Sequence, residues 1–239
     1  MDIHFYEELP STNRTASEAA RGGAEEFYTV VANRQSVGRG RMERSFFSPM
    51  GGTYFSTVLR PKMPIGHYGQ ITPMAAVAVH RALYRLTGTV TEIKWINDLL
   101  LNGKKVCGIL AESGTDEKGK PFVILGIGIN TAHVDFPPEL CHTATFIPCA
   151  DRVGLINAIL TELAAYEQLI KNAAWLPYYR EYCGFLGNAV LVCEGNQSRV
   201  GVALDILGDG ALRVDFGDGR IEDLRGGEIS LRFAHSAEI

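Results

Sequence analysis

The sequence lacks several features that would fix the class of the protein directly. No apolar run approaches the roughly 18 residues that a membrane span requires, so neither a membrane protein nor a membrane partner is expected. Basic charge is not in surplus either. With 23 Lys and Arg against 27 Asp and Glu, the formal net charge is −4, which argues against a general nucleic-acid binder. The five cysteines are irregularly spaced and no apolar leader precedes Asp2, so we expect a reducing, cytoplasmic environment.

Three familiar signatures are present only as fragments. Cys141-His142 with Cys149 lacks the second close-spaced pair of a zinc site, and no metal-ligand residues are predicted. Gly126 and Gly128 begin a dinucleotide fingerprint that has no third glycine. The triplet 215–217 (D-F-G) has no accompanying kinase motif. These fragments are better interpreted as buried or incidental thiols, strand glycines and turn residues.

The most informative segment that is present spans residues 33–49, where arginines are interrupted by glycines. Its arginines are Arg34, Arg39, Arg41 and Arg44, and Glu43 is its one acidic residue. Gly38 and Gly40 allow the main chain to approach a ligand closely. Arg39 and Arg41, two residues apart, leave the same side of an extended chain and can clamp phosphate or carboxylate oxygens. The alternative is a solvated basic turn or a nucleic-acid patch.

Five motifs occur in a defined order along the chain. They are S-T-N at 11–13, G-R-G-R at 38–41, K-W-I-N-D at 94–98, G-K-K-V-C-G-I-L at 103–110 and G-I-G-I-N at 126–130. In this order they resemble the catalytic domain of biotin protein ligases, enzymes that attach biotin to a lysine of a carrier protein. The matches run from about residue 5 to 130, and the C-terminal segment resembles the small β-barrel of that family.

The pattern of apolar residues predicts an α+β protein with a mixed sheet. Expected strands are 2–9, 28–32, 53–59, 91–95, 99–101, 106–111 and 123–129, and expected helices are 16–21, 72–86 and 151–172, the last being the longest. Past residue 184, five short strands separated by glycine turns predict an SH3-like barrel. With the resemblance, this implies a class II synthetase-like catalytic domain at 1–184 and a small β-barrel domain at 185–239.

The resemblance implies a reaction in two steps. Biotin and ATP first form biotinyl-5′-AMP and pyrophosphate, with Mg²⁺ and fixed cations offsetting the repulsion between the two anions. Arg39, Arg41 and Arg44 would supply that positive field, and Lys94 would bridge the biotin carboxylate and the α-phosphate. The lysine of a biotin carboxyl carrier protein then displaces AMP. Alone, Lys94 would be interpreted as a solvated lysine at a strand end, and the K-W-I-N-D context favours the catalytic role.

The resemblance also assigns individual residues. The catalytic set is Lys94, Arg39 and Arg41. The biotin set is Ser11, Thr12, Asn13, Gln35, Gly38, Arg39, Gly40, Arg41, Lys94 and Gly108, in which Ser11, Thr12, Asn13 and Gln35 would hold the ureido head group. The ATP set is Arg39, Arg41, Arg44, Phe46, Lys94, Asn97 and Asn130, in which Phe46 would stack on adenine. For Ser11 and Thr12, helix capping is the alternative role.

The sequence departs from the usual pattern of the family at four positions. Met42 replaces an arginine, Glu43 a glycine, Phe46 a tryptophan and Ile96 a proline. A lost cation and a new carboxylate beside the phosphates are expected to weaken nucleotide binding unless Glu43 points outward or helps to hold Mg²⁺. Phenylalanine keeps a stacking face of smaller area.

The same resemblance raises alternative functions and bears on the expected partners. A lipoate or octanoate ligase or transferase of the same fold is an alternative enzyme hypothesis. A non-catalytic biotin sensor is a further hypothesis, from a different class of function. The catalytic-like sequence begins within the first ten residues, so we expect no DNA-binding domain and no DNA partner. Relatives in the family form a homodimer through sheet edges, and no residue here decides that question.

Overall fold

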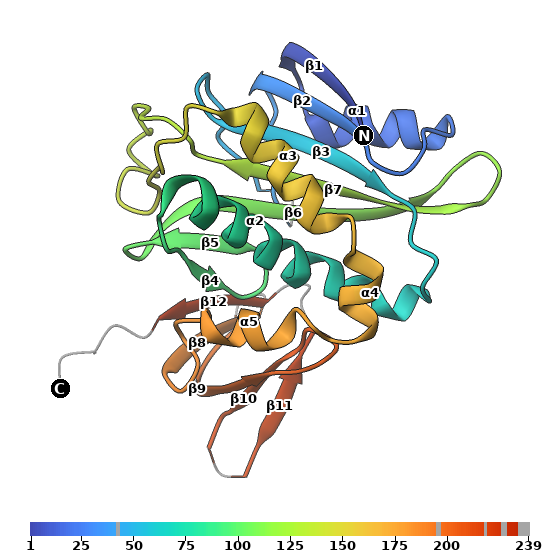
Figure 1. Ribbon diagram of the computed structural model, residues 1–239. Helices are drawn as coiled ribbons and strands as arrows, with labels where there is room; N and C mark the ends of the chain where they lie inside the picture. Colours follow the sequence, from blue (N-terminus) through green and yellow to red (C-terminus); the bar gives the residue numbers. More distant parts are fainter. Residues whose placement is uncertain (42–43, 195–196, 218, 226–228, 234–239) are drawn as a thin grey trace.

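The chain forms two β-sheets, with helices packed on both faces of the larger one (Figure 1). The computed structural model describes residues 1–239 except 42–43, 195–196, 218, 226–228 and 234–239. The larger sheet has the strand order β1-β2-β3-β7-β6-β5-β4. Its strands are β1 (Asp2–Leu9), β2 (Tyr28–Gln35), β3 (Thr53–Leu59), β4 (Glu92–Lys94), β5 (Asp98–Leu101), β6 (Lys104–Thr115) and β7 (Pro121–Ile129). Only the β1–β2 pair is parallel among these described strands, so the sheet is mixed, as predicted.

Alternation along the strands produces two different faces. In β7, Leu125 belongs to the main core under α2 (Ile71–Thr87) and α3 (Arg152–Leu163), whereas its neighbour Ile124 belongs to a small cluster under α1 (Thr12–Arg21). Successive side chains of a strand point to opposite faces, which accounts for this division. The short α1 covers only part of its face. The uncovered part, beside the N-terminus of α1, is where the functional site lies.

The long helix predicted for residues 151–172 is wrong in its extent. Asp151 is the N-cap, as predicted, and its carboxylate accepts a hydrogen bond from Gly154 N at 2.8 Å. However, α3 ends at Leu163, and a separate helix, α4 (Tyr166–Lys171), follows at a changed angle (Figure 1). Tyr166 is buried and its hydroxyl donates to Glu26 at 2.9 Å. This contact with a residue distant in sequence overrides the helical periodicity, and α2 is the longest helix among the described residues.

The hairpin predicted at Asn102-Gly103 is confirmed. Both residues have positive φ, 51° and 74°, and they join β5 to β6. This is the backbone conformation for which Asn-Gly is favoured in two-residue hairpin turns. The remaining helices are η1 (Ile65–Gln70), which leads into α2, and α5 (Leu176–Glu181), which leads toward the second sheet.

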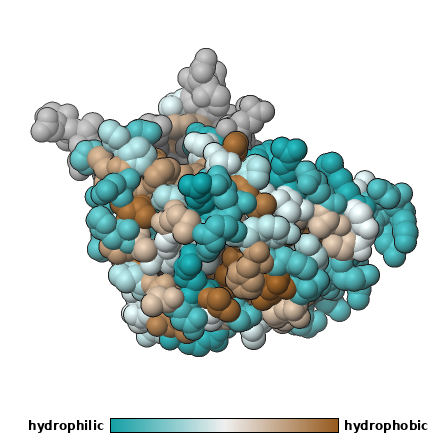
Figure 2. Space-filling view, turned by 90° about the horizontal axis from the view of Figure 1, so that it is seen from above, coloured by the Kyte–Doolittle hydropathy of each residue, from teal (hydrophilic) through white to brown (hydrophobic). Residues whose placement is uncertain are grey.

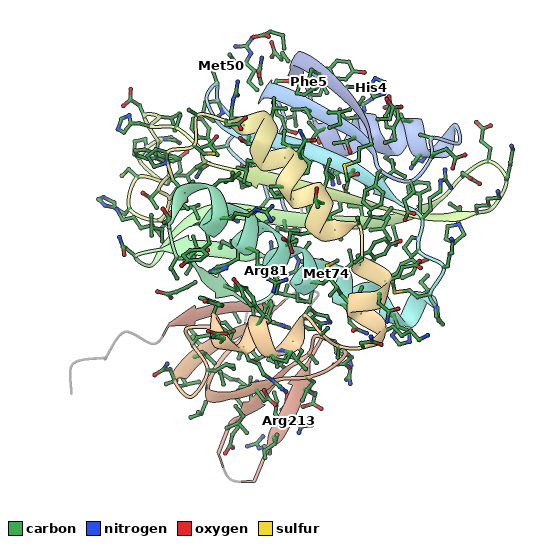
Figure 3. All side chains as sticks on the ribbon, viewed as in Figure 1. His4, Phe5, Met50, Met74, Arg81 and Arg213 are labelled. Carbon is green, nitrogen blue, oxygen red and sulfur yellow. The ribbon has the colours of Figure 1, made fainter. Side chains whose placement is uncertain are left out.

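The second sheet is antiparallel and has the five strands predicted from the glycine-separated repeats. In the order β11-β10-β9-β8-β12, its strands are β11 (Ile221–Leu224), β10 (Leu212–Asp215), β9 (Gln197–Ile206), β8 (Ala189–Glu194) and β12 (Ile229–Phe233). Figure 3 shows Met74 and Arg81 on α2, which packs against the larger sheet and α5, and Arg213 in the second sheet. Helix α5 connects the layers, and its Arg180 donates to the carbonyl of Ile206 at 2.7 Å.

The surface mixes hydrophobic and hydrophilic residues, as the ordinary apolar content of the sequence predicts (Figure 2). Seen from the end where β1 and β2 lie, hydrophobic residues form separate groups among hydrophilic ones (Figure 2). Among the described residues, no helix combines the length and apolar character that a membrane crossing requires.

Candidate active site

A cavity of about 180 Å³ opens on the α1 face of the larger sheet. Twelve of the fourteen predicted site residues line it. These are Ser11, Thr12, Asn13, Gln35, Arg39, Gly40, Arg41, Arg44, Phe46, Lys94, Asn97 and Gly108. They come from the start of α1, the end of β2, the arginine segment, β4, the turn after β4, and β6. The fold therefore gathers motifs that are up to about a hundred residues apart into one site.

Glycines of the central strands form the base of the cavity. Gly126 and Gly128 of β7 lie on the α1 face, and Gly108 of β6 pairs with Gly128. A Cβ on Gly126 would lie 1.9 Å from the side-chain oxygen of Asn13, and a Cβ on Gly128 would lie 2.5 Å from the ring of Phe46. The G-I-G-I-N motif is therefore a close-approach surface, which explains the two glycines without a dinucleotide site.

One end of the cavity is a polar network. The Gln35 side-chain oxygen accepts from Thr12 N at 2.8 Å, and its amide nitrogen donates to Ser48 Oγ at 2.8 Å. Ser56 Oγ lies 2.7 Å from Thr12 Oγ1 and 2.6 Å from Asn13 Oδ1. These bonds fix the amide and hydroxyl groups that face the cavity. Ser11 is buried at the N-cap position of α1 without a side-chain capping bond, so hydroxyl capping, the alternative considered from the sequence, is not seen.

The network reaches the arginine segment through Glu112. One carboxylate oxygen accepts from Asn13 Nδ2 at 2.7 Å, and the other lies 3.3 Å from a guanidinium nitrogen of Arg39. A single carboxylate thus links the polar end of the cavity to the cationic end.

The other end of the cavity is strongly cationic. Arg39, Arg41, Arg44, Lys94 and Lys105 line it together with one carboxylate, Asp98. Asp98 is paired with Lys105 at 2.7 Å, and the Lys105 ammonium also lies 5.6 Å from the centroid of the Phe46 ring. Burial lowers the pKa of the Arg41 guanidinium, and nearby Asp98 opposes that shift. Arg41 donates to Asn97 Oδ1 at 3.4 Å. Partly desolvated cations of this kind are suited to binding an anion.

The arginine segment forms a hairpin in its described part. Gly40 N donates to Arg44 O at 2.7 Å, and Phe46 N donates to Gly38 O at 2.8 Å. The hairpin carries Arg39, Arg41 and Phe46 over the cavity. Met42 and Glu43, two of the four departures from the family pattern, lie outside the described residues. Arg34 lies before the hairpin, on β2, where it is paired with Glu8 outside the cavity.

Two predicted residues do not line the cavity. Asn130 is buried, and its amide donates to the carbonyl of Thr145 at 2.9 Å, so its side chain holds a loop in place. Gly38 lies under the hairpin, where a Cβ would be 2.3 Å from the carbonyl oxygen of Phe46. Both positions therefore shape the surroundings of the cavity in this structure.

The prediction from the sequence also missed residues that the structure places in or beside the cavity. Among them are Ser45, Ser48, Ser56, Trp95, Asp98, Lys105 and Glu112. Ser56 is a polar residue in β3, a strand that is buried along its whole length, and Glu112 follows Gly108 and Leu110 on the same face of β6. A polar residue at alternate positions of a buried strand was the available signal.

The described residues fit Mg²⁺ only as part of a nucleotide complex. No group of three or more His, Cys, Asp or Glu among them could hold a metal ion. Asp98 and Glu112 are each paired with a cation. Magnesium is commonly held by one or two carboxylates together with substrate phosphates, which requires no dedicated cage.

Comparisons with known proteins agree with this geometry. A family model described as the biotin/lipoate A/B protein ligase family matches residues 6–130, and a model described as the biotin protein ligase C terminal domain matches residues 185–232.

Individual relatives are similar over most of the chain. The bifunctional ligase/repressor BirA of Bacillus subtilis (strain 168) is 36% identical over 238 residues, covering 95% of this chain and 73% of the relative. The biotin–[acetyl-CoA-carboxylase] ligase of Mycobacterium tuberculosis is 30% identical over 236 residues, covering 93% and 86%. Among solved structures, the biotin protein ligase from Aquifex aeolicus in complex with biotin and ATP has a TM-score of 0.80 at 25% identity, covering 98% of this chain and 99% of that chain.

Proposed function

Since the chain belongs to the biotin/lipoate A/B protein ligase family, we propose that it activates biotin with ATP and transfers it to a lysine of a biotin carboxyl carrier protein. It is an ATP-dependent ligase, as its homologues are. The observation that carries the proposal is the single cavity in which a hydrogen-bonding end and a cationic end meet over a glycine base.

The polar end suits the ureido head group of biotin. That group offers two N–H donors and one carbonyl acceptor, and Ser11, Thr12, Asn13 and Gln35 present oriented hydroxyl and amide groups at this end. The dithiolane of lipoate offers no N–H donors and would leave these polar groups without partners. A site built for hydrogen bonds rejects a ligand that lacks them.

The cationic end suits the first chemical step. A carboxylate oxygen of biotin forms a bond to the α-phosphorus of ATP, and the bond from that phosphorus to the pyrophosphate breaks. Arg39, Arg41 and Lys94 would hold the two anions together and stabilise the charge that develops on the leaving group. Lys105, which also lines the cavity and is paired with Asp98, adds a second compact ammonium. Mg²⁺ would enter with ATP, bound chiefly by the phosphates.

In the second step, the neutral amine of the carrier lysine attacks the acyl carbon of biotinyl-5′-AMP and forms an amide bond. The bond from that carbon to the phosphate oxygen breaks, AMP leaves with the oxygen and the bonding electrons, and the amine releases one proton to solvent. The same cations would stabilise the tetrahedral intermediate and the departing phosphate. The ring of Phe46 lies over Gly128 in the cavity lining. It would supply the aromatic face on which adenine stacks, in place of the tryptophan of the family pattern. All five cysteines are free thiols, which supports the cytoplasm as the site of the reaction.

The test is direct. Purified protein incubated with a carrier domain, MgATP and either biotin or lipoate should increase the carrier mass by one biotinyl group and leave it unchanged with lipoate. Modification by lipoate alone would replace the proposal with the alternative ligase of the same fold.

A further inference from the structure

The strand that ends in Lys94 is the shortest of the described strands and lies at the margin of the larger sheet. β4 has three residues and pairs with one strand, β5. An element held by so few backbone hydrogen bonds is easily displaced. The position of the Lys94 ammonium therefore depends on what holds the residues next to it.

The C-terminal part of the chain supplies that support. Ile93 N donates to the carbonyl of Tyr182, just past α5, at 2.7 Å. Trp95, directly after Lys94, is 5% exposed, and its indole N–H donates to the carbonyl of Gly210 at 2.8 Å. Gly210 belongs to the tight turn between β9 and β10, in which Gly210 N donates to Leu207 O at 2.9 Å. The buried bond thus joins residues 115 positions apart.

Trp95 begins a short turn that ends at Asn97, and the Asn97 end of this turn is bound to the larger sheet. Ile109 N donates to Asn97 O at 2.8 Å, and the Asn97 amide donates to Ile109 O at 3.1 Å. The turn from Trp95 to Asn97 is therefore held by the larger sheet at one end and by the second sheet at the other. Trp95 and Asn97, the two ends of this turn, themselves line the cavity beside Lys94.

We propose that Trp95 is a positioning residue. Its hydrogen bond to Gly210 of the second sheet holds the end of β4 in place and thereby fixes the position of Lys94 in the cavity. The inference rests on the proposed function, because it concerns the same adenylation step. It gives the second sheet a part in forming biotinyl-5′-AMP without any contact between that sheet and the substrates.

The two tryptophans of the chain provide a matched comparison. Trp175 is also buried, at 1% exposure, but its indole nitrogen has no hydrogen-bond partner among the described residues. Trp95→Phe and Trp175→Phe remove the same atoms, and only the first breaks a hydrogen bond. We expect Trp95→Phe to lower kcat for adenylate formation by on the order of tenfold, with a smaller change in KM for biotin, and Trp175→Phe to leave kcat within about twofold. Equal effects of the two variants on kcat would overturn the inference.

The turn between β9 and β10 offers a second pair of variants, at positions that lie outside the cavity lining. Gly210 has φ +87°, and a Cβ there would lie 3.3 Å from Pro73, whereas a Cβ on Gly208 would meet open space. Gly210→Ala should lower kcat as Trp95→Phe does, and Gly208→Ala should not. Because Trp95 and Gly210 act through one bond, the double variant Trp95→Phe/Gly210→Ala should be no worse than either single variant. Multiplicative losses in the double variant would show independent effects and contradict the inference.

The wild-type protein is assayed first, so that two kinds of failure stay separate. Absence of biotinyl-5′-AMP from the wild-type reaction would remove the proposed function. Normal wild-type activity with equal kcat values for all four single variants would remove only the role of Trp95. If Trp95→Phe does not fold, as judged by circular dichroism, the Gly210→Ala and Gly208→Ala pair decides the question.

Discussion

Replacement of Lys94 by alanine should greatly reduce adenylate formation while leaving the protein folded. Lys94 ends β4, lines the cavity and is only partly buried, so its removal leaves no large internal void. The matched control is Lys104→Ala. Lys104 begins β6, lies outside the cavity lining and reaches the carbonyl of Cys141 at 3.4 Å.

The expected size of the effect follows from the number of cations. A unit charge about 4 Å from a phosphate, at an effective dielectric constant near 20, contributes about 4 kcal/mol. Four other cationic side chains remain in the lining, and loss of one preorganised donor usually lowers kcat by about 10²–10³. We therefore expect a loss of that order for Lys94→Ala and a change within about twofold for Lys104→Ala.

The assay is biotin-dependent release of pyrophosphate from ATP, measured beside thermal unfolding of each variant. The melting temperature of Lys94→Ala should stay close to that of the wild type. Near-normal pyrophosphate release by a folded Lys94→Ala protein would refute the assignment of Lys94. An equal loss in Lys104→Ala would show that any nearby cation suffices.

Three further predictions follow from the same structure. Arg39→Ala and Arg41→Ala should raise KM for biotin and ATP and lower kcat, whereas Arg34→Ala, outside the cavity, should have little effect; similar kinetics for all three would indicate a diffuse basic patch. Trypsin should cut after Arg39, Arg41 or Arg44 rapidly in the free protein and slowly with biotin and ATP, since a bound anion relieves the repulsion between these arginines and holds their side chains on the ligand; equal rates would rule out closure on the ligand. Burial lowers the pKa of His80, so the unfolded chain takes up its proton at higher pH than the folded chain. The free energy of unfolding from urea titrations should therefore fall as pH drops below the ordinary histidine value of about 6.5, by at most about 1.4 kcal/mol per pH unit from this group, and His80→Gln should show a shallower dependence.

Local patterns predicted most of the fold because most elements here obey local rules. The Asn102-Gly103 turn and the N-cap at Asp151 follow from residue chemistry alone. The break after Leu163 does not, because it depends on the contact between Tyr166 and Glu26, which are 140 residues apart. The division into two domains at residues 184 and 185 stays a prediction.

The site residues that belong to sequence motifs could be predicted, whereas those whose position depends on strand pairing could not. Arg39, Arg41 and Lys94 belong to motifs, and the structure places them together. Ser56 and Glu112 belong to strands, and which face they occupy depends on pairing that a single sequence does not reveal. The roles assigned to the site residues remain predictions for the variants above.

Mass spectrometry of the purified protein after incubation with biotin and MgATP separates a ligase from a biotin sensor. We expect a biotinyl-5′-AMP species that forms in the wild-type protein and is lost in Lys94→Ala. Addition of a biotin carboxyl carrier domain should consume this species and add one biotinyl group to the carrier. Binding of biotin without formation of any adenylate would show that the protein is a biotin sensor and not a ligase.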